Sequence, residues 1–326
     1  MSFGEKLINV FGEIKTQITP KGLMLLGEKL SAVKMPDPES QIYVLICPFL
    51  SLESQKYCQE KNINFIDLSG NILLRIPGKL LIQRLGKPNL YKAPQLFRNP
   101  FIGGSSRILR ILLKSPKRRW TVTEIEKELI QESQKQNTKD AFKLSISSIS
   151  KTIRSLEEKL LIRRDNLAIL IPEPRYLLSL WAEKYRERYT SIKRSAWTEN
   201  NPFALDVELS IKGLKMRFPD LDYLVTGTAA ANLMAPFVNT DRIDVFIQRN
   251  QASLIQRAFR DEQSVGPNFL FLFPDDKGVA MYAQDIKGLK IVSPIQSYLD
   301  CYTRGGRDAK QADYLLTERI EKEWRR

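Results

Sequence analysis

Residues 105–172 constrain this chain most, because three helical segments are followed there by a short strand-like run. An apolar helix pattern, SSRILRILLKSP, comes first, and the segment TVTEIEKEL follows it. A serine-rich segment, LSISSISKTIRSLEEKLL, comes third, and IRRDNLAILIP closes the stretch. This order predicts a winged helix-turn-helix over residues 99–172, in which the third helix can lie in a major groove of DNA.

The first and third segments each carry one apolar face, as helices that pack together do. These faces consist of Ile108, Leu109, Ile111, Leu112 and Leu113 in the first segment and of Ile146, Ile149, Ile153, Leu156 and Leu160 in the third. Thr123, with Glu126 three residues later, predicts a capping box for the second helix. Ser145 is placed to cap the third helix, after a connector that is longer than a standard turn.

The opposite face of the third helix predicts contact with DNA. Short hydroxyl side chains allow the helix backbone to approach the duplex, and Lys151 and Arg154 can reach phosphates or guanine edges. Arginines after this helix fit the turn of a wing, and cations before the second helix fit a crossing of the DNA backbone. The predicted DNA-binding residues are Arg118, Arg119, Thr121, Ser145, Ser147, Ser148, Lys151, Thr152, Arg154, Ser155, Arg163 and Arg164. The alternative is a packing or dimerisation module with solvated charges.

The charge distribution favours a polyanionic partner. The net charge is +14, and residues 105–172 hold 15 Lys and Arg against 8 Asp and Glu, a net +7. Histidine is absent, which excludes Ser-His-Asp and Cys-His catalysis and histidine-ligated zinc. Three scattered cysteines predict no disulfide framework, and no catalytic residue, metal ligand or cofactor is expected. We expect a cytoplasmic protein, since no apolar run approaches the length of a membrane span and the amphipathic start is not a secretory signal.

The flanking sequence predicts a multidomain α+β or α/β chain. Residues 1–98 fit a small α/β domain, with helices over 6–18 and 21–33, a strand in QIYVLICPFL, a helix capped by Ser51, and then a strand, a turn and a strand. Residues 173–202 predict a long connecting helix from Pro174 to Arg194, whose apolar stripe packs on a neighbouring domain. Residues 203–326 fit a C-terminal α/β domain.

The C-terminal domain resembles a degenerate nucleotidyltransferase fold. The stretch TGTAAANLMAPFVNTDRIDVFI places a glycine-containing turn and a helix before an acidic strand. Metal-dependent nucleotidyl transfer needs two carboxylates one residue apart, yet Arg242 stands two residues before Asp244. Asp241 and Asp244 point to opposite faces of a strand, so the sequence predicts the fold without the chemistry.

The N-terminal domain could descend from a restriction-endonuclease-like fold. Such a site needs an Asp and then an acidic residue and a lysine on the adjacent strand. Gln83 and Arg84 occupy these positions after Asp67, so no metal triad can be assembled. Asp67, with SGN after it, is predicted to form a structural turn.

Several motifs occur in an order that resembles the AbiEi family of type IV toxin–antitoxin antitoxins. They are NFIDLSGNILLR, the predicted winged helix, LLSLWAEKY, YLVTGTAAANLMAP and SPIQSYLDCYTRGGRDAKQA, and they extend from about residue 40 to the C-terminus. The resemblance implies an antitoxin that represses its own promoter by binding inverted repeats. It also implies a cognate nucleotidyltransferase-type toxin, countered functionally rather than in a stable complex. The α/β unit before the winged helix and the long connector depart from the family pattern.

The sequence therefore predicts a sequence-specific regulator that binds double-stranded DNA and contacts no membrane, and an antitoxin rather than an enzyme. A replication or partition protein of a mobile element, with the same DNA-binding chemistry, is one alternative. A magnesium-dependent nucleotidyltransferase or nuclease is the other.

Overall fold

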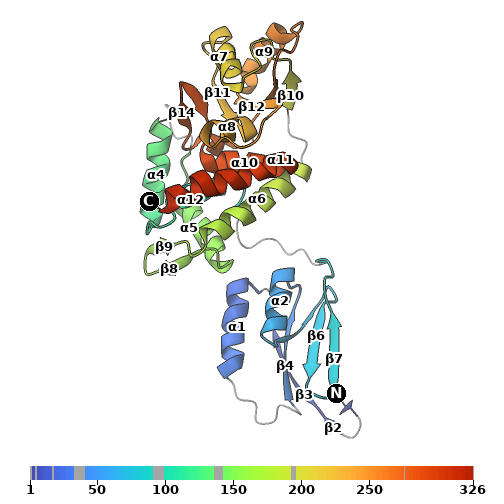
Figure 1. Cartoon of the computed structure of the whole chain (residues 1–326). Helices are drawn as coiled ribbons and strands as arrows, with labels where there is room; N and C mark the ends of the chain where they lie inside the picture. The colour runs from blue at the N-terminus through green and yellow to red at the C-terminus, as the bar shows by residue number, and fades with distance from the viewer. Residues whose placement is uncertain are drawn as a thin grey trace. The chain divides into compact units, whose positions relative to one another are not determined.

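A computed structural model describes residues 2–3, 6–16, 18–32, 41–90, 99–135, 142–191, 196–274 and 276–325. This part of the chain is a mixed α/β structure with several sheets, as the sequence predicts (Figure 1). None of its helices combines the length and the apolar character needed to cross a membrane. The chain divides into two compact units, Met1–Phe97 with Arg154–Leu160, and Arg98–Ile153 with Leu161–Arg326.

The first unit is built on a five-stranded sheet of order β3-β4-β5-β6-β7. The strands are β3 (Asn9–Ile14), β4 (Gln41–Cys47), β5 (Asn64–Asp67), β6 (Ile72–Ile76) and β7 (Leu80–Arg84). Strands β3, β4 and β5 are parallel, whereas β6 and β7 continue the sheet antiparallel. Helices α1 (Pro20–Ala32) and α2 (Leu52–Glu60) follow β3 and β4 and lie on the same side of the sheet (Figure 1). A short pair, β1 (Ser2–Phe3) with β2 (Lys6–Leu7), precedes them.

The helix predicted over residues 6–18 is wrong, since β2 and β3 occupy this stretch. Its apolar spacing fits the period of a helix and that of a strand, and pairing with β4 along the whole length of β3, from Asn9↔Gln41 to Ile14↔Ile46, decides in favour of the strand. The cap of α2 is confirmed, because Ser51 Oγ accepts from Ser54 N at 3.2 Å. The predicted structural turn is also present, with buried Asp67 accepting from the backbone N of Leu50 and of Asn71.

Three helices and a hairpin come next along the chain, and the second unit holds all of them except residues 154–158 at the end of the third helix. They are α3 (Gly103–Lys114), α4 (Val122–Lys135), α5 (Ile146–Glu158), β8 (Arg163–Asp165) and β9 (Ala168–Leu170). The five apolar residues predicted for the first helix are all fully buried in α3. Trp120 forms a backbone bridge with Ile169, which ties the segment before α4 to the hairpin. Residues 136–141 of the predicted connector lie outside the described residues.

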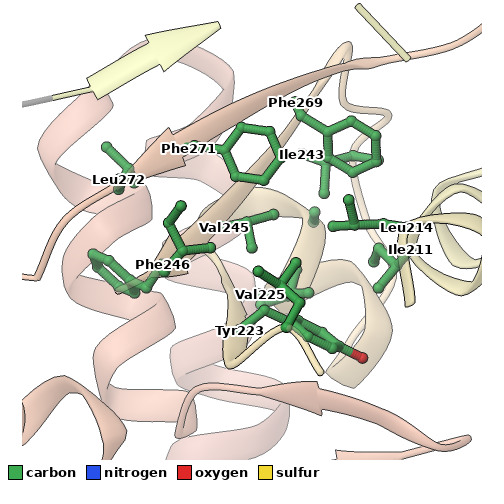
Figure 2. Close-up of a cluster of buried hydrophobic side chains, with 14 of the residues drawn as sticks. Ile211, Leu214, Tyr223, Val225, Ile243, Val245, Phe246, Phe269, Phe271 and Leu272 are labelled. Carbon is green, nitrogen blue, oxygen red and sulfur yellow. The ribbon is translucent and has the colours of Figure 1, made fainter. Parts of the chain in front are cut away.

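A six-stranded mixed sheet of order β10-β13-β12-β11-β15-β14 forms the rest of the core. The strands are β10 (Ala196–Glu199), β11 (Tyr223–Thr226), β12 (Arg242–Ile247), β13 (Asn268–Leu272), β14 (Gln284–Ile286) and β15 (Leu289–Ile291). The helices near this sheet include α7 (Val207–Arg217), α8 (Gly227–Met234) and α9 (Ala252–Phe259). Figure 2 shows Val225, Val245 and Phe271 of three adjacent strands gathered with Ile211 and Leu214 of α7. The sequence prediction missed β10, α7 and β14.

Helix α6 (Pro174–Ser191) confirms the predicted connecting helix as far as Ser191, and residues 192–194 lie outside the described part. Its apolar stripe packs on two neighbours that belong to the same compact unit. Trp181 Nε1 donates to Phe101 O at 3.2 Å, just before α3. Tyr185 donates to Asp300 Oδ1 at 2.9 Å on α10 (Pro294–Arg304), which runs beside α6 (Figure 1). The chain closes with α11 (Gly306–Leu315), a π-helical turn (Leu316–Ile320) and α12 (Glu321–Arg325).

The segment that follows β13 holds α3 and α4 against the C-terminal sheet region. Arg107 of α3 forms an ion pair with Asp276 at 2.7 Å. Glu132 of α4 is buried and accepts from Tyr282 N at 2.9 Å, while Lys114 lies 3.8 Å from the centre of the Tyr282 ring. Side chains of α3 and α4 make these contacts, so the two helices and the C-terminal sheet form one packed body.

Arg110 of α3 is a buried cation that lacks a hydrogen-bonded partner for Nε and for Nη1 within the described part of the chain. Burial lowers its pKa, and its guanidinium lies 5.0 Å from the Trp181 ring. Desolvation outweighs the attraction of Asp276 and Asp300, so replacing this charge by an apolar side chain in Arg110→Met should raise the free energy of unfolding by about 1–4 kcal/mol. Urea unfolding measures this. The matched variant Arg107→Met removes the partner of Asp276 and should lower the free energy of unfolding. If both variants lowered it, the buried charge of Arg110 would not be destabilising.

Candidate nucleic-acid interface

The N-terminus of α5 is capped as the sequence predicts. Ser145 Oγ accepts from Ser148 N at 3.2 Å, and Ser145 O accepts from Ile149 N at 3.0 Å. Ser145 and Ser147 are exposed and Ser148 is partly exposed. The first turn of α5 therefore presents small hydroxyl side chains beside the positive end of a helix dipole, where a phosphate group can approach the backbone.

One exposed stripe continues from this turn along α5. Ser147, Lys151 and Arg154 are exposed, and their spacing of four and three residues places them on the same side of the helix. On the other side, Ile149, Ile153 and Leu156 are fully buried. The helix thus separates a core-facing side from a polar and basic side, which is the arrangement that contact with a phosphate backbone needs.

Thr152 and Ser155 do not belong to this stripe, so their prediction as DNA-contacting residues is wrong. Both are fully buried. The hydroxyl of Thr152 donates to Ser148 O at 2.9 Å and lies 3.1 Å from Ser105 Oγ on α3. The buried arc of α5 is wider than its isoleucines indicate, because small hydroxyl residues complete it. In the opposite sense, Ile146 and Leu160, at the two ends, are 52% and 42% exposed instead of buried.

The capping box of α4 lies two residues earlier than the sequence predicts. Thr121 Oγ1 accepts from Glu124 N at 3.2 Å, and Glu124 Oε2 accepts from Thr121 N at 2.8 Å. Thr123 and Glu126 therefore do not form the box. Arg118 bonds Glu124 at 2.9 Å, and this hydrogen bond is the largest cause of the lowered pKa of Glu124. Thr121 thus has a structural role, and Arg118 is already partnered by a carboxylate.

The hairpin carries the remaining predicted cations. Arg163 and Arg164 are exposed on β8, and the turn that follows contains Asn166 in a left-handed conformation (φ 54°). Asp165 accepts from Arg119 at 2.5 Å, and this bond is the largest cause of the lowered pKa of Asp165. The Trp120–Ile169 bridge brings these two residues together. The prediction for Arg119 missed this neutralising partner, although an acidic residue beside two arginines of a predicted wing was a visible signal.

The acidic strand of the C-terminal sheet places Asp244, but not Asp241, in a buried position. The Asp244 carboxylate is 4% exposed and contacts two guanidinium groups, Arg242 Nε at 3.0 Å and Arg304. Gly227 has a φ of 61°, and a Cβ there would lie 3.1 Å from Asp244 Oδ2. The described residues include no group of three His, Cys, Asp or Glu side chains able to hold a metal ion. The sequence predicted the cation at 242 but not Arg304, which lies sixty residues after Asp244.

No family model matches this sequence, and neither a curated protein nor a solved structure matches it.

The Arg119–Asp165 pair leads to a prediction about affinity for DNA. Asp165→Asn removes a charge that a phosphate would have to compete with, so binding to any duplex should tighten several-fold. The increase should be larger at low salt, because the exposed pair is screened at high salt. Fluorescence anisotropy with two unrelated duplexes at two salt concentrations measures this. Asp313→Asn, an exposed carboxylate on α11, is the control. If both variants bound DNA more tightly by the same factor, the change in net charge alone would explain the effect.

Proposed function

We propose that this chain is a sequence-specific regulator of transcription that binds double-stranded DNA through a winged helix-turn-helix, residues 99–172. In this proposal α5 is the recognition helix and β8–β9 is the wing. The observation that carries the proposal is the exposed stripe of α5, where hydroxyl side chains of a capped first turn are followed by Lys151 and Arg154. A major groove accommodates one helix with such a surface.

The surrounding cations support phosphate contacts rather than base reading. Arg163 and Arg164 are exposed on the wing strand. Arg118 and Arg119 have carboxylate partners that a phosphate can replace. Each neutralised phosphate releases counterions, so affinity should fall steeply as salt increases. A single unit of this size gives limited specificity, and we expect paired binding to inverted half-sites.

We further propose that the regulator is the autorepressing antitoxin of a type IV toxin–antitoxin module. The order of motifs that resembles the AbiEi family supports this, and so does the β11–α8–β12 arrangement of the C-terminal region, which fits a degenerate nucleotidyltransferase fold. In this proposal a nucleotidyltransferase-type toxin is encoded beside it and is countered without a stable complex.

The alternatives differ in what they require of the C-terminal region. A nucleotidyltransferase would need the Asp244 carboxylate for magnesium, but two guanidinium groups contact that carboxylate. Such an enzyme would incorporate nucleotide with magnesium and lose this activity in Asp244→Ala. A replication or partition protein would use the same DNA-binding surface on an origin.

The decisive experiment is a gel-shift titration of the full chain with its own upstream DNA against a scrambled duplex, at two salt concentrations. Binding that is specific for an inverted repeat and weaker at high salt is expected. Equal, weak binding to both duplexes would contradict the proposal and leave the three-helix unit a packing module. Specific binding only to an origin fragment would favour the replication protein.

A further inference from the structure

Strand β3 forms one edge of the sheet in the first unit. The strand order ends at β3, which pairs with β4 alone, so its outer backbone groups have no neighbouring strand among the residues that the structure describes. Unpaired N–H and C=O groups in a row are a template for pairing with another chain. At six residues, β3 is long enough to form a regular ladder.

The side chains of β3 are also those of an interface rather than of a protected edge. Val10, Phe11 and Ile14 are 45%, 46% and 74% exposed. The single charged residue of the strand, Glu13, is 2.9 Å from Lys15 and is neutralised by it. Natural edges are usually blunted by lysine, proline, a bulge or a covering element, and the sequence NVFGEI has no lysine or proline.

The other described sheet edges fit pairing less well. Strand β7 ends in Gln83 and Arg84, so its edge carries a charge. Strands β10 and β14 have only four and three residues and include Glu199 and Asp285. Strand β3 is the longest of these edges, and its single charge is paired with Lys15, so it is the edge best suited to form a ladder with a partner strand.

We propose that β3 pairs antiparallel with β3 of a second copy of this chain, around a two-fold axis at Gly12. This register places Val10 of each copy opposite Ile14 of the other, so two exposed apolar side chains meet on the same face of the sheet. Glu13 lies opposite Phe11 in both halves, and no like charges face each other. Ile46 Cδ1 would lie 3.2 Å from a Cβ at Gly12, so a neighbouring side chain already covers the position on the axis. This self-complementarity favours a second copy over a foreign strand.

The pairing would join the sheets of two copies and would present two DNA-binding units to one operator. Its role in binding inverted half-sites rests on the function proposed above. The dimer itself does not, because it forms through the first unit in the absence of DNA. A failure of the dimer and a failure of DNA binding can therefore be told apart.

Sedimentation velocity of the full chain without DNA tests the pairing. The natural protein should be a dimer. Ile14→Lys should be a folded monomer, since this side chain is exposed and a lysine on an edge blocks pairing. Leu81→Lys, at a 61% exposed position on β7, is the matched control and should remain dimeric. A monomeric natural protein, or a dimer that Leu81→Lys disrupts and Ile14→Lys does not, would overturn the proposal.

Disulfide trapping tests the register. The native cysteines Cys47, Cys58 and Cys301 are free and buried, so an added surface cysteine reacts selectively. A mixture of Val10→Cys and Ile14→Cys chains should form a cross-linked dimer under mild oxidation, because these positions face each other across the axis. Each variant alone should cross-link far less. Equal cross-linking of each variant alone would overturn the proposed register.

Discussion

Lys151→Ala with Arg154→Ala should weaken binding to the specific operator by at least about 30-fold, which corresponds to ~2 kcal/mol. Both side chains are exposed on the stripe of α5, one helical turn apart, and each contact with a phosphate or a guanine edge is worth about 1–3 kcal/mol. Where a lost contact is to phosphate, the salt dependence of affinity should also become shallower, by about one unit of slope per contact. Fluorescence anisotropy at several salt concentrations gives both quantities.

A control variant with the same change in net charge distinguishes the loss of direct contacts to DNA from the loss of overall attraction. Lys127→Ala with Lys310→Ala removes two exposed lysines from α4 and α11, and this too lowers the net charge from +14 by two. Only a small loss of affinity is expected, since long-range attraction is screened at physiological salt. If the two double variants lost affinity equally, or if neither did, α5 would not be the recognition helix.

The sequence was sufficient where local chemistry decides the structure. The serine cap of α5, the apolar side of α3, the strand β4 and the helix α6 were all predicted from spacing and capping residues. The conformation of residues 6–14 was not predicted correctly. Their apolar spacing fits a helix as well as a strand, and pairing with the parallel strand β4 selects the strand. Thr152 and Ser155 were misplaced for a related reason: a short hydroxyl residue can complete a buried face as well as an exposed one.

The partners of the candidate site depend on contacts between segments far apart in the chain. Asp165 neutralises Arg119 across the Trp120–Ile169 bridge, and Arg304 reaches Asp244 from α10. A sequence shows which residues are charged, but the separation between these partners hides which charges cancel. The cations of a basic module therefore need a structure before any of them is assigned to DNA.

Helix α10 explains how the three-helix unit and the C-terminal sheet become one body. Asp300 on α10 is 3% exposed and accepts from Tyr185 of α6 at 2.9 Å and from Thr226 of β11 at 2.6 Å. Gln296 donates to the same carboxylate at 2.7 Å and to the Tyr185 hydroxyl oxygen at 3.0 Å. Since α6 also bonds the backbone before α3 through Trp181, this carboxylate lies at the centre of a chain of contacts from sheet to helices.

Asp300→Ala should consequently destabilise the second unit by about 3–5 kcal/mol, because it leaves three buried donors without their acceptor. Urea unfolding followed by tryptophan fluorescence reports on this unit, since every tryptophan of the chain lies between residues 120 and 324. Asp300→Asn keeps an acceptor oxygen and should cost less, whereas Asp313→Ala, on the exposed side of α11, should change stability by no more than ~0.5 kcal/mol. If Asp300→Ala unfolded at the same urea concentration as Asp313→Ala, the carboxylate would not hold α6 and β11 to α10, and packing alone would join them.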